Sequence, residues 1–140
     1  MKALILLTFL IPKLYATTAN DVKKLCYIKP CEIKADFDGD GKKDLATLVQ
    51  NNKAEKGIQI KFANKKTVLV GAGEVIGNGG SNYDWMDHWE VYHGKITPGP
   101  TESEKMKSVK GDSLYLAKTN SASGIIYWDG SAFNWIQQGD

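Results

Sequence analysis

The amino-acid sequence predicts a mainly β protein, a single small antiparallel β domain (barrel or sandwich) with a short N-terminal helix. Two observations indicate this class. Short apolar stretches recur at close spacing and are rich in aromatic and β-branched residues, and turns rich in Gly and Asn separate them. No element is repeated along the chain, so a repeat array is not expected.

Residues 1–16 have the pattern of a secretory signal peptide. Lys2 precedes a largely apolar run, residues 3–11, and Ala16 or Ala19 supplies the small residue at the cleavage site. The run is too short to span a bilayer, and no other segment is a membrane candidate. The remainder, residues 17–140, is expected to form one exported domain, periplasmic or secreted, that does not span a membrane.

The charge balance argues against nucleic acid as a partner. The chain has no Arg, and removal of Lys2 and Lys13 with the signal peptide leaves sixteen lysines against sixteen acidic residues. Recognition of phosphates and base edges depends heavily on Arg and on a basic face, which a near-neutral chain without Arg does not offer.

Cys26 and Cys31 are the only cysteines, and in an exported protein such a pair is expected to form a disulfide. The four intervening residues include a proline and do not fit the C-x-x-C spacing of redox-active sites. The bond should therefore fix the N-terminal segment.

The expected secondary structure can be given in order along the chain. A helical turn or two is expected after the signal, capped by Thr18 or Asn20, with Val22 and Leu25 on one side. Gly-rich residues 71–84 read as a long functional loop, and residues 129–132 as a hairpin turn. Strands are expected at residues 33–35, 45–49, 57–63, 67–70, 85–93, 113–117, 124–128 and 133–137.

An acidic loop is the strongest chemical signal, with the pattern D-x-D-x-D-G-x-x-D. Hard cations such as calcium bind six to eight oxygens, and alternating side chains of a tight loop can converge on one point. Gly41 permits the sharp turn. The ligands expected for calcium are the carboxylates of Asp36, Asp38 and Asp40, the backbone carbonyl of Lys42, and Asp44 directly or through water.

The position that holds a bidentate Glu in an EF-hand is Thr47, so a helix-loop-helix calcium sensor is not expected. The stretch ADFDGDGKKDLATLV instead resembles the calcium loop of FG-GAP and VCBS repeats. That resemblance implies calcium ligation by the aspartates and a strand at residues 45–49. It covers about fifteen residues in a single copy, so it does not carry over a propeller fold.

The C-terminal hairpin is a second informative stretch, because it is more aromatic than a small core requires. Packing against the opposite sheet accounts for at least half of these aromatics, and the others would form a recognition surface. Its Ser-Gly-x-x-Tyr pattern is similar to that of bacterial periplasmic C-type lysozyme inhibitors, but the lysine that this family places downstream is missing. The candidate residues for this surface are Ser123, Tyr127, Trp128, Phe133 and Trp135.

Both histidines lie near acidic residues at 84–93. His88 and His93 fall on opposite faces of the expected strand, so a shared zinc ion would need irregular backbone. An enzyme that uses His88 and Glu90, with Asp87 nearby, is one alternative. No sequence motif of a hydrolase or a phosphate-binding loop is present.

Three function classes follow. The first is an exported, non-enzymatic calcium-binding β module with a binding role at the cell envelope, whose partner is an envelope protein or a glycan. The second is a periplasmic lysozyme inhibitor, and the third is an envelope enzyme that uses His88 and Glu90.

Overall fold

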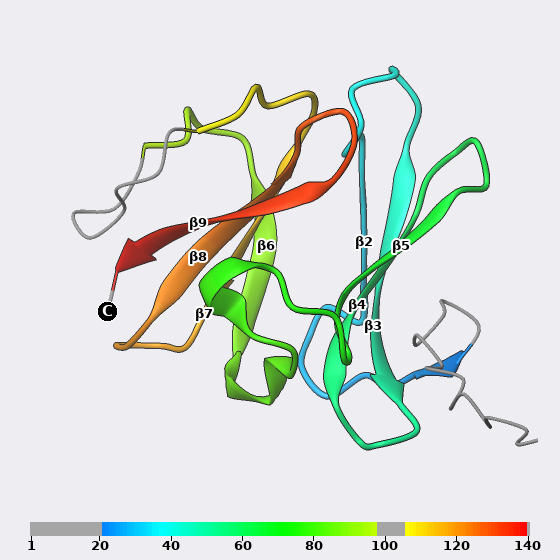
Figure 1. Cartoon of the computed structure of the whole chain (residues 1–140), viewed down its shortest axis with the longest axis vertical. Coiled ribbons are helices and arrows are strands. Elements are labelled where there is room, and N and C mark those ends of the chain that lie inside the picture. Colours follow the sequence, from blue (N-terminus) through cyan, green and yellow to red (C-terminus); the bar gives the residue numbers. More distant parts are fainter. Residues whose placement is uncertain (1–20, 98–105, 140) are drawn as a thin grey trace, which may run out of the picture.

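The computed structural model describes residues 21–97 and 106–139, which form two antiparallel sheets (Figure 1). The expected signal peptide lies outside the described residues. The first sheet comprises β1 (Val22–Lys24), β2 (Glu32–Ala35), β3 (Asp44–Asn51), β4 (Lys56–Lys61) and β5 (Thr67–Gly71). The second comprises β6 (His88–Tyr92), β7 (Ser113–Ala117), β8 (Ser123–Trp128) and β9 (Phe133–Gly139), in that order. The mainly β prediction is confirmed, and the described strands form no closed barrel.

From Val22 on, the expected N-terminal helix is wrong, and its expected cap residues, Thr18 and Asn20, lie outside the described residues. The segment after Asp21 is instead strand β1, which pairs with β3 in the register Val22 to Asn51 and Lys24 to Val49. A three-residue strand has little intrinsic preference of its own, so its pairing with a long neighbouring strand decides its conformation. The described ranges contain no α-helix, and their 3-10 turns include η2 (Gly77–Gly79) and η3 (Tyr83–Trp85).

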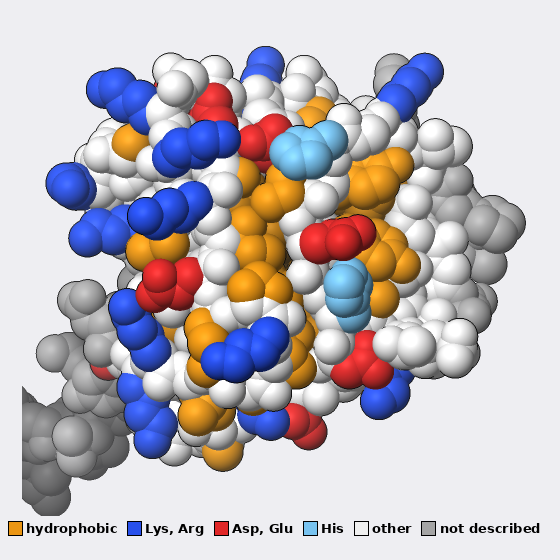
Figure 2. All heavy atoms as spheres, turned by 180° about the vertical axis from the view of Figure 1, so that it is seen from behind, with side chains coloured by type: hydrophobic (Ala, Val, Ile, Leu, Met, Phe, Trp, Pro, Cys, Tyr) orange, Lys and Arg blue, Asp and Glu red, His pale blue; other side chains and the backbone are white. Residues whose placement is uncertain are grey.

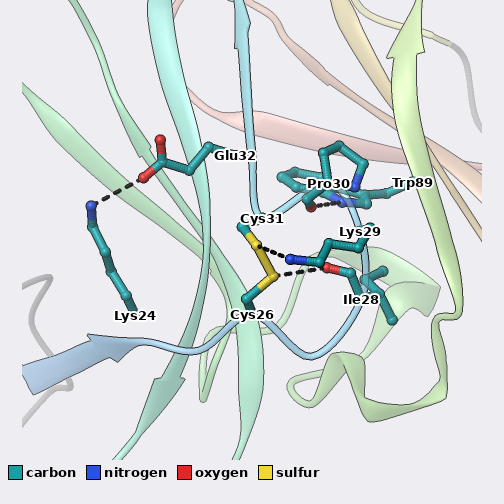
Figure 3. Close-up of a disulfide and its surroundings, with 8 residues drawn as sticks. All are labelled: Lys24, Cys26, Ile28, Lys29, Pro30, Cys31, Glu32 and Trp89. Carbon is teal, nitrogen blue, oxygen red and sulfur yellow. Dashed lines mark hydrogen bonds and ion pairs between the residues drawn. A yellow bond between two sulfur atoms is a disulfide. The ribbon is translucent and has the colours of Figure 1, made fainter.

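The predicted disulfide between Cys26 and Cys31 is confirmed (Figure 3). Strands β1 and β2 pair with successive parts of the same edge of β3, and the disulfide closes the loop between them. The backbone of Leu48 on β3 bonds to both ends of this loop, accepting from the N–H of Leu25 and donating to the carbonyl of Cys31. The loop therefore behaves as a bulge within one interrupted edge strand.

This disulfide loop also joins the two sheets. The indole N–H of Trp89 on β6 donates to the carbonyl of Pro30 at 2.8 Å, and Figure 3 shows the Trp89 ring beside Pro30. Trp89 itself is 1% exposed. A small loop at the edge of the first sheet thus covers a core side chain of the second.

The two sheets share one core. The alternation expected at Ile58, Ile60 and Phe62 places all three inside it, and they pack with Trp128 and Phe133 from the second sheet. Seen from behind, apolar side chains lie in the middle of the molecule between lysines on one side and both histidines on the other (Figure 2). Burial of apolar surface between the sheets is the main stabilising term.

The Gly-rich segment connects β5 to β6 and lies beside the disulfide loop, because Lys56, which pairs with Asp84, also lies 4.9 Å from the ring centroid of Tyr27. It contains η2 and η3, and η2 contacts β9 of the second sheet (Figure 1). Lys56 on β4 pairs with Asp84 of η3 at 2.5 Å, so the segment is also attached to the first sheet. No helix in the described part of the chain is long and apolar enough to cross a membrane.

Candidate metal centre

The acidic loop connects β2 to β3 at one end of the first sheet. Phe37, between the first two aspartates, is fully buried in the shared core and anchors the loop. The Asp36 carboxylate accepts three backbone N–H groups, those of Gly39, Asp40 and Gly41, at 2.8 to 3.1 Å. The spacing of the sequence therefore produces a tight turn wound around one carboxylate.

Three of the predicted ligands come together. One carboxylate oxygen from each of Asp36, Asp38 and Asp40 lies within 4.8 Å of the others. Burial raises the pKa of the Asp38 carboxyl, and the neighbouring carboxylates of Asp44 and Asp40 raise that pKa further, against one backbone N–H that lowers it. Such mutual repulsion is relieved when a cation binds.

Asp44 takes a different place from the one expected of a direct ligand. It is 3% exposed, and its two oxygens accept the backbone N–H groups of Phe37 at 2.8 Å and Ala63 at 2.9 Å. The three-residue cluster does not include it. Asp44 therefore links the acidic loop to the β4–β5 turn and stabilises the loop from its buried side.

Asp112, directly before β7 of the second sheet, was not among the residues predicted from the sequence. Its Oδ2 accepts the N–H of Asp36 at 3.0 Å, and its own N–H donates to the carbonyl of Asp36 at 2.8 Å. These residues are 76 positions apart, so no local pattern links them. The acidic loop therefore lies on the seam between the two sheets.

Gly39 fits this seam closely. Its φ is +75°, in the left-handed region, and a Cβ at this position would collide with the backbone carbonyl of Lys110. Any other residue would strain the turn and push the 110–112 segment away from the acidic loop.

The donor set suits a hard cation. Three clustered carboxylates supply oxygen ligands, and calcium accepts such ligands together with backbone carbonyls and waters in a flexible geometry. Lys42, whose N–H donates to Asp40 Oδ1, is exposed at the loop surface and contributes to this turn. The site contains no sulfur or imidazole ligand, so zinc fits it less well than calcium does.

The residues expected to form a recognition surface are divided among four places. Trp128 and Phe133 lie in the core between the sheets, while Tyr127 is buried on the outer face of the second sheet, where its hydroxyl accepts the N–H of Lys107. Ser123 is half-buried at a register shift between β8 and β9. Trp135 is half-buried and packs against Trp85 of the Gly-rich segment.

The residues of the enzyme alternative do not form one cluster. His88 and Glu90 form an exposed pair at 3.3 Å on β6. Asp87 instead accepts the backbone N–H and hydroxyl of Thr119, contacts that lower its pKa. His93 Nδ1 lies 3.7 Å from Asp112. Figure 2 shows both histidines at the surface.

No protein-family model, curated protein or solved structure matches the chain, so the resemblances described above stay predictions.

Proposed function

We propose that the protein is an exported calcium-binding β module with a non-catalytic binding role at the cell envelope. The observation that carries the calcium proposal is the convergence of Asp36, Asp38 and Asp40 on a loop that is hydrogen-bonded across the seam to Asp112. A cation held there would fix the loop whose backbone bonds to Asp112 of the second sheet. Its role would be structural, with the modest affinity of extracellular modules, Kd about 10⁻⁴ to 10⁻³ M.

Export is supported by two features of the chain. The N-terminal sixteen residues have the composition of a signal peptide, and the Cys26–Cys31 disulfide suits an oxidising compartment. The disulfide is directly in the edge strand of the fold, where reduction would loosen the contact with Trp89.

Calcium titration of the mature chain, from Thr17 on, tests the proposal. Calorimetry should show millimolar or tighter binding, and the melting temperature should rise with calcium, since a ligand that binds only the folded state stabilises it. The Asp38→Ala, Asp40→Ala variant should lose both effects.

A charge-matched control separates a specific site from general screening. Glu32→Ala, Glu90→Ala removes two exposed carboxylates on other strands and should keep the calcium response. Equal responses from the two double variants, or no heat and no thermal shift at millimolar calcium, would contradict the proposal.

A further inference from the structure

A cleft of about 260 Å³ opens where the Gly-rich segment meets the inner face of the second sheet. We call it the indole cleft, because Trp85 of η3 and Trp135 of β9 line it together. Their rings meet edge to face, with centroids 6.0 Å apart and planes at 83°. The two residues are fifty positions apart, one on the 3-10 turn η3 and the other on strand β9.

Both indoles are held in place by their own N–H groups. Trp85 Nε1 donates to the carbonyl of Gly79 at 3.1 Å, and Trp135 Nε1 donates to Gln137 Oε1 at 3.0 Å. Gln137 in turn donates through Nε2 to the carbonyl of Gly139. The indole N–H groups are therefore committed within the protein, and the rings offer a ligand their carbon surfaces.

Glycines allow the ring of Trp135 to pack directly against the backbone. A Cβ on Gly124 of β8 would collide with the six-membered ring of this indole, and a Cβ on Gly79 would lie 2.8 Å from its Cζ3. The ring thus lies flat against backbone, where it cannot change rotamer without losing these contacts. A rigid aromatic surface binds a ligand with little loss of side-chain entropy.

The rim of the indole cleft is polar and close to neutral. Asn78 and Ser121 are exposed on it, and among the described residues neither the amide nor the hydroxyl has a hydrogen-bond partner. The one cation on the rim, Lys118, lies 3.6 Å from the Asp87 carboxylate, which balances its charge. The cleft therefore combines fixed apolar rings with neutral groups that donate and accept hydrogen bonds.

We propose that the indole cleft binds a neutral carbohydrate of one or two sugar rings. A pyranose ring has C–H faces that stack on an indole and a rim of hydroxyls that bond to amide and hydroxyl groups, which matches this lining. The volume is just below the range of about 300–1,000 Å³ for drug-sized ligands, which limits the ligand to a short segment. This inference rests on the binding role proposed above and does not depend on calcium.

Indole resonances in nitrogen-15 NMR spectra provide the test, with chitotriose and cellotriose as probes. The chain has four tryptophans, two of which are internal controls because Trp89 and Trp128 are buried in the core. At least one probe should shift the Trp85 and Trp135 signals in a saturable manner and leave the other two unchanged. No shift with either sugar, or equal shifts of all four indoles, would overturn the proposal.

Substitutions in the indole cleft test which residues bind the sugar. Trp135→Ala should weaken binding by about tenfold or more, the usual effect of removing a central contact. The exposed double variant Asn78→Ala, Ser121→Ala removes the polar groups of the rim and should weaken binding measurably, though by less. The double variant keeps the core intact, so it remains informative if Trp135→Ala does not fold. Val75→Ala, an exposed change in the same segment but outside the cleft, should bind as the wild type does.

The salt dependence of sugar binding and the calcium-site variant provide two further controls. Binding of a neutral sugar should be insensitive to 0.5 M sodium chloride, whereas affinity that collapses with salt would indicate a charged ligand and contradict the proposal. The Asp38→Ala, Asp40→Ala variant should still bind the sugar. Failure of the sugar test with a normal calcium response would therefore reject the indole cleft alone.

Discussion

Asp129 organises the turn between β8 and β9 almost by itself. Its carboxylate accepts bonds from the Asn134 amide and from the backbone N–H groups of Ala132 and Ser131, and these contacts hold its pKa well below the usual range. In the unfolded chain the same carboxyl should titrate near the ordinary aspartate pKa of about 3.9. A depressed pKa in the folded state stabilises the protein above that pH, and this contribution is lost as the pH falls below it.

We therefore predict that Asp129→Asn flattens the acid dependence of stability. The free energy of unfolding of the wild type, from urea titrations, should fall between pH 5 and pH 3 by more than that of the variant. At pH 7 the variant should be less stable by about 1.5–3 kcal/mol, the range for hydrogen bonds to charged groups. Glu90→Gln serves as the control, and a variant with the same acid slope as wild type would refute the role assigned to Asp129.

The disulfide loop is short, but it contributes to both sheets. It closes a gap within the edge strand β1–β2 and positions the carbonyl of Pro30 for Trp89. Cys26→Ser, Cys31→Ser should lower the free energy of unfolding by about 2 kcal/mol, as expected for a short closed loop. The Trp89 indole N–H should also exchange faster with solvent, because its acceptor is no longer fixed.

Reduction of the wild type provides an independent check of the same prediction. The reduced protein and the double-serine variant should unfold at the same urea concentration, since both lose only the covalent link. A variant as stable as the oxidised wild type, with unchanged Trp89 exchange, would show that pairing with β3 alone holds the loop.

Local sequence determined most strands but not the edge segment or the contacts across the seam. Alternation at Ile58, Ile60 and Phe62 identifies β4 because half of that strand faces a core. Val22 and Leu25 fit a helical face as well as a strand, and the choice depends on the open edge of β3, far along the chain.

In the candidate site, too, the residues of the local loop could be predicted from the sequence, and the contacts between sheets could not. The D-x-D-x-D spacing identified Asp36, Asp38 and Asp40, because a local loop can be read from local residues. Asp112 and the meeting of Trp85 with Trp135 depend on how the sheets and loops pack, and no spacing in the sequence encodes them. The inward position of Asp44 likewise depends on the β4–β5 turn at Ala63.

On the scale of the whole molecule, the two sheets are joined by a shared core and by polar contacts along one seam. Phe62, directly after β4, packs on Trp128 and Phe133 of the second sheet, while Trp89 and Asp112 bond to backbone of the loops on either side of β2. Because the core is continuous, the described domain should unfold in one cooperative transition.

Asp112→Ala tests how the seam contributes to that cooperativity. The change leaves the N–H of Asp36 without its acceptor, so unfolding should become easier by about 1–3 kcal/mol. The denaturant m-value should stay the same, because the apolar core that couples the sheets is untouched. Asp112→Asn keeps an acceptor oxygen and should recover most of the loss. Two separate transitions in Asp112→Ala, followed by near-ultraviolet circular dichroism and far-ultraviolet signal, would show instead that the polar seam is what makes the sheets unfold together.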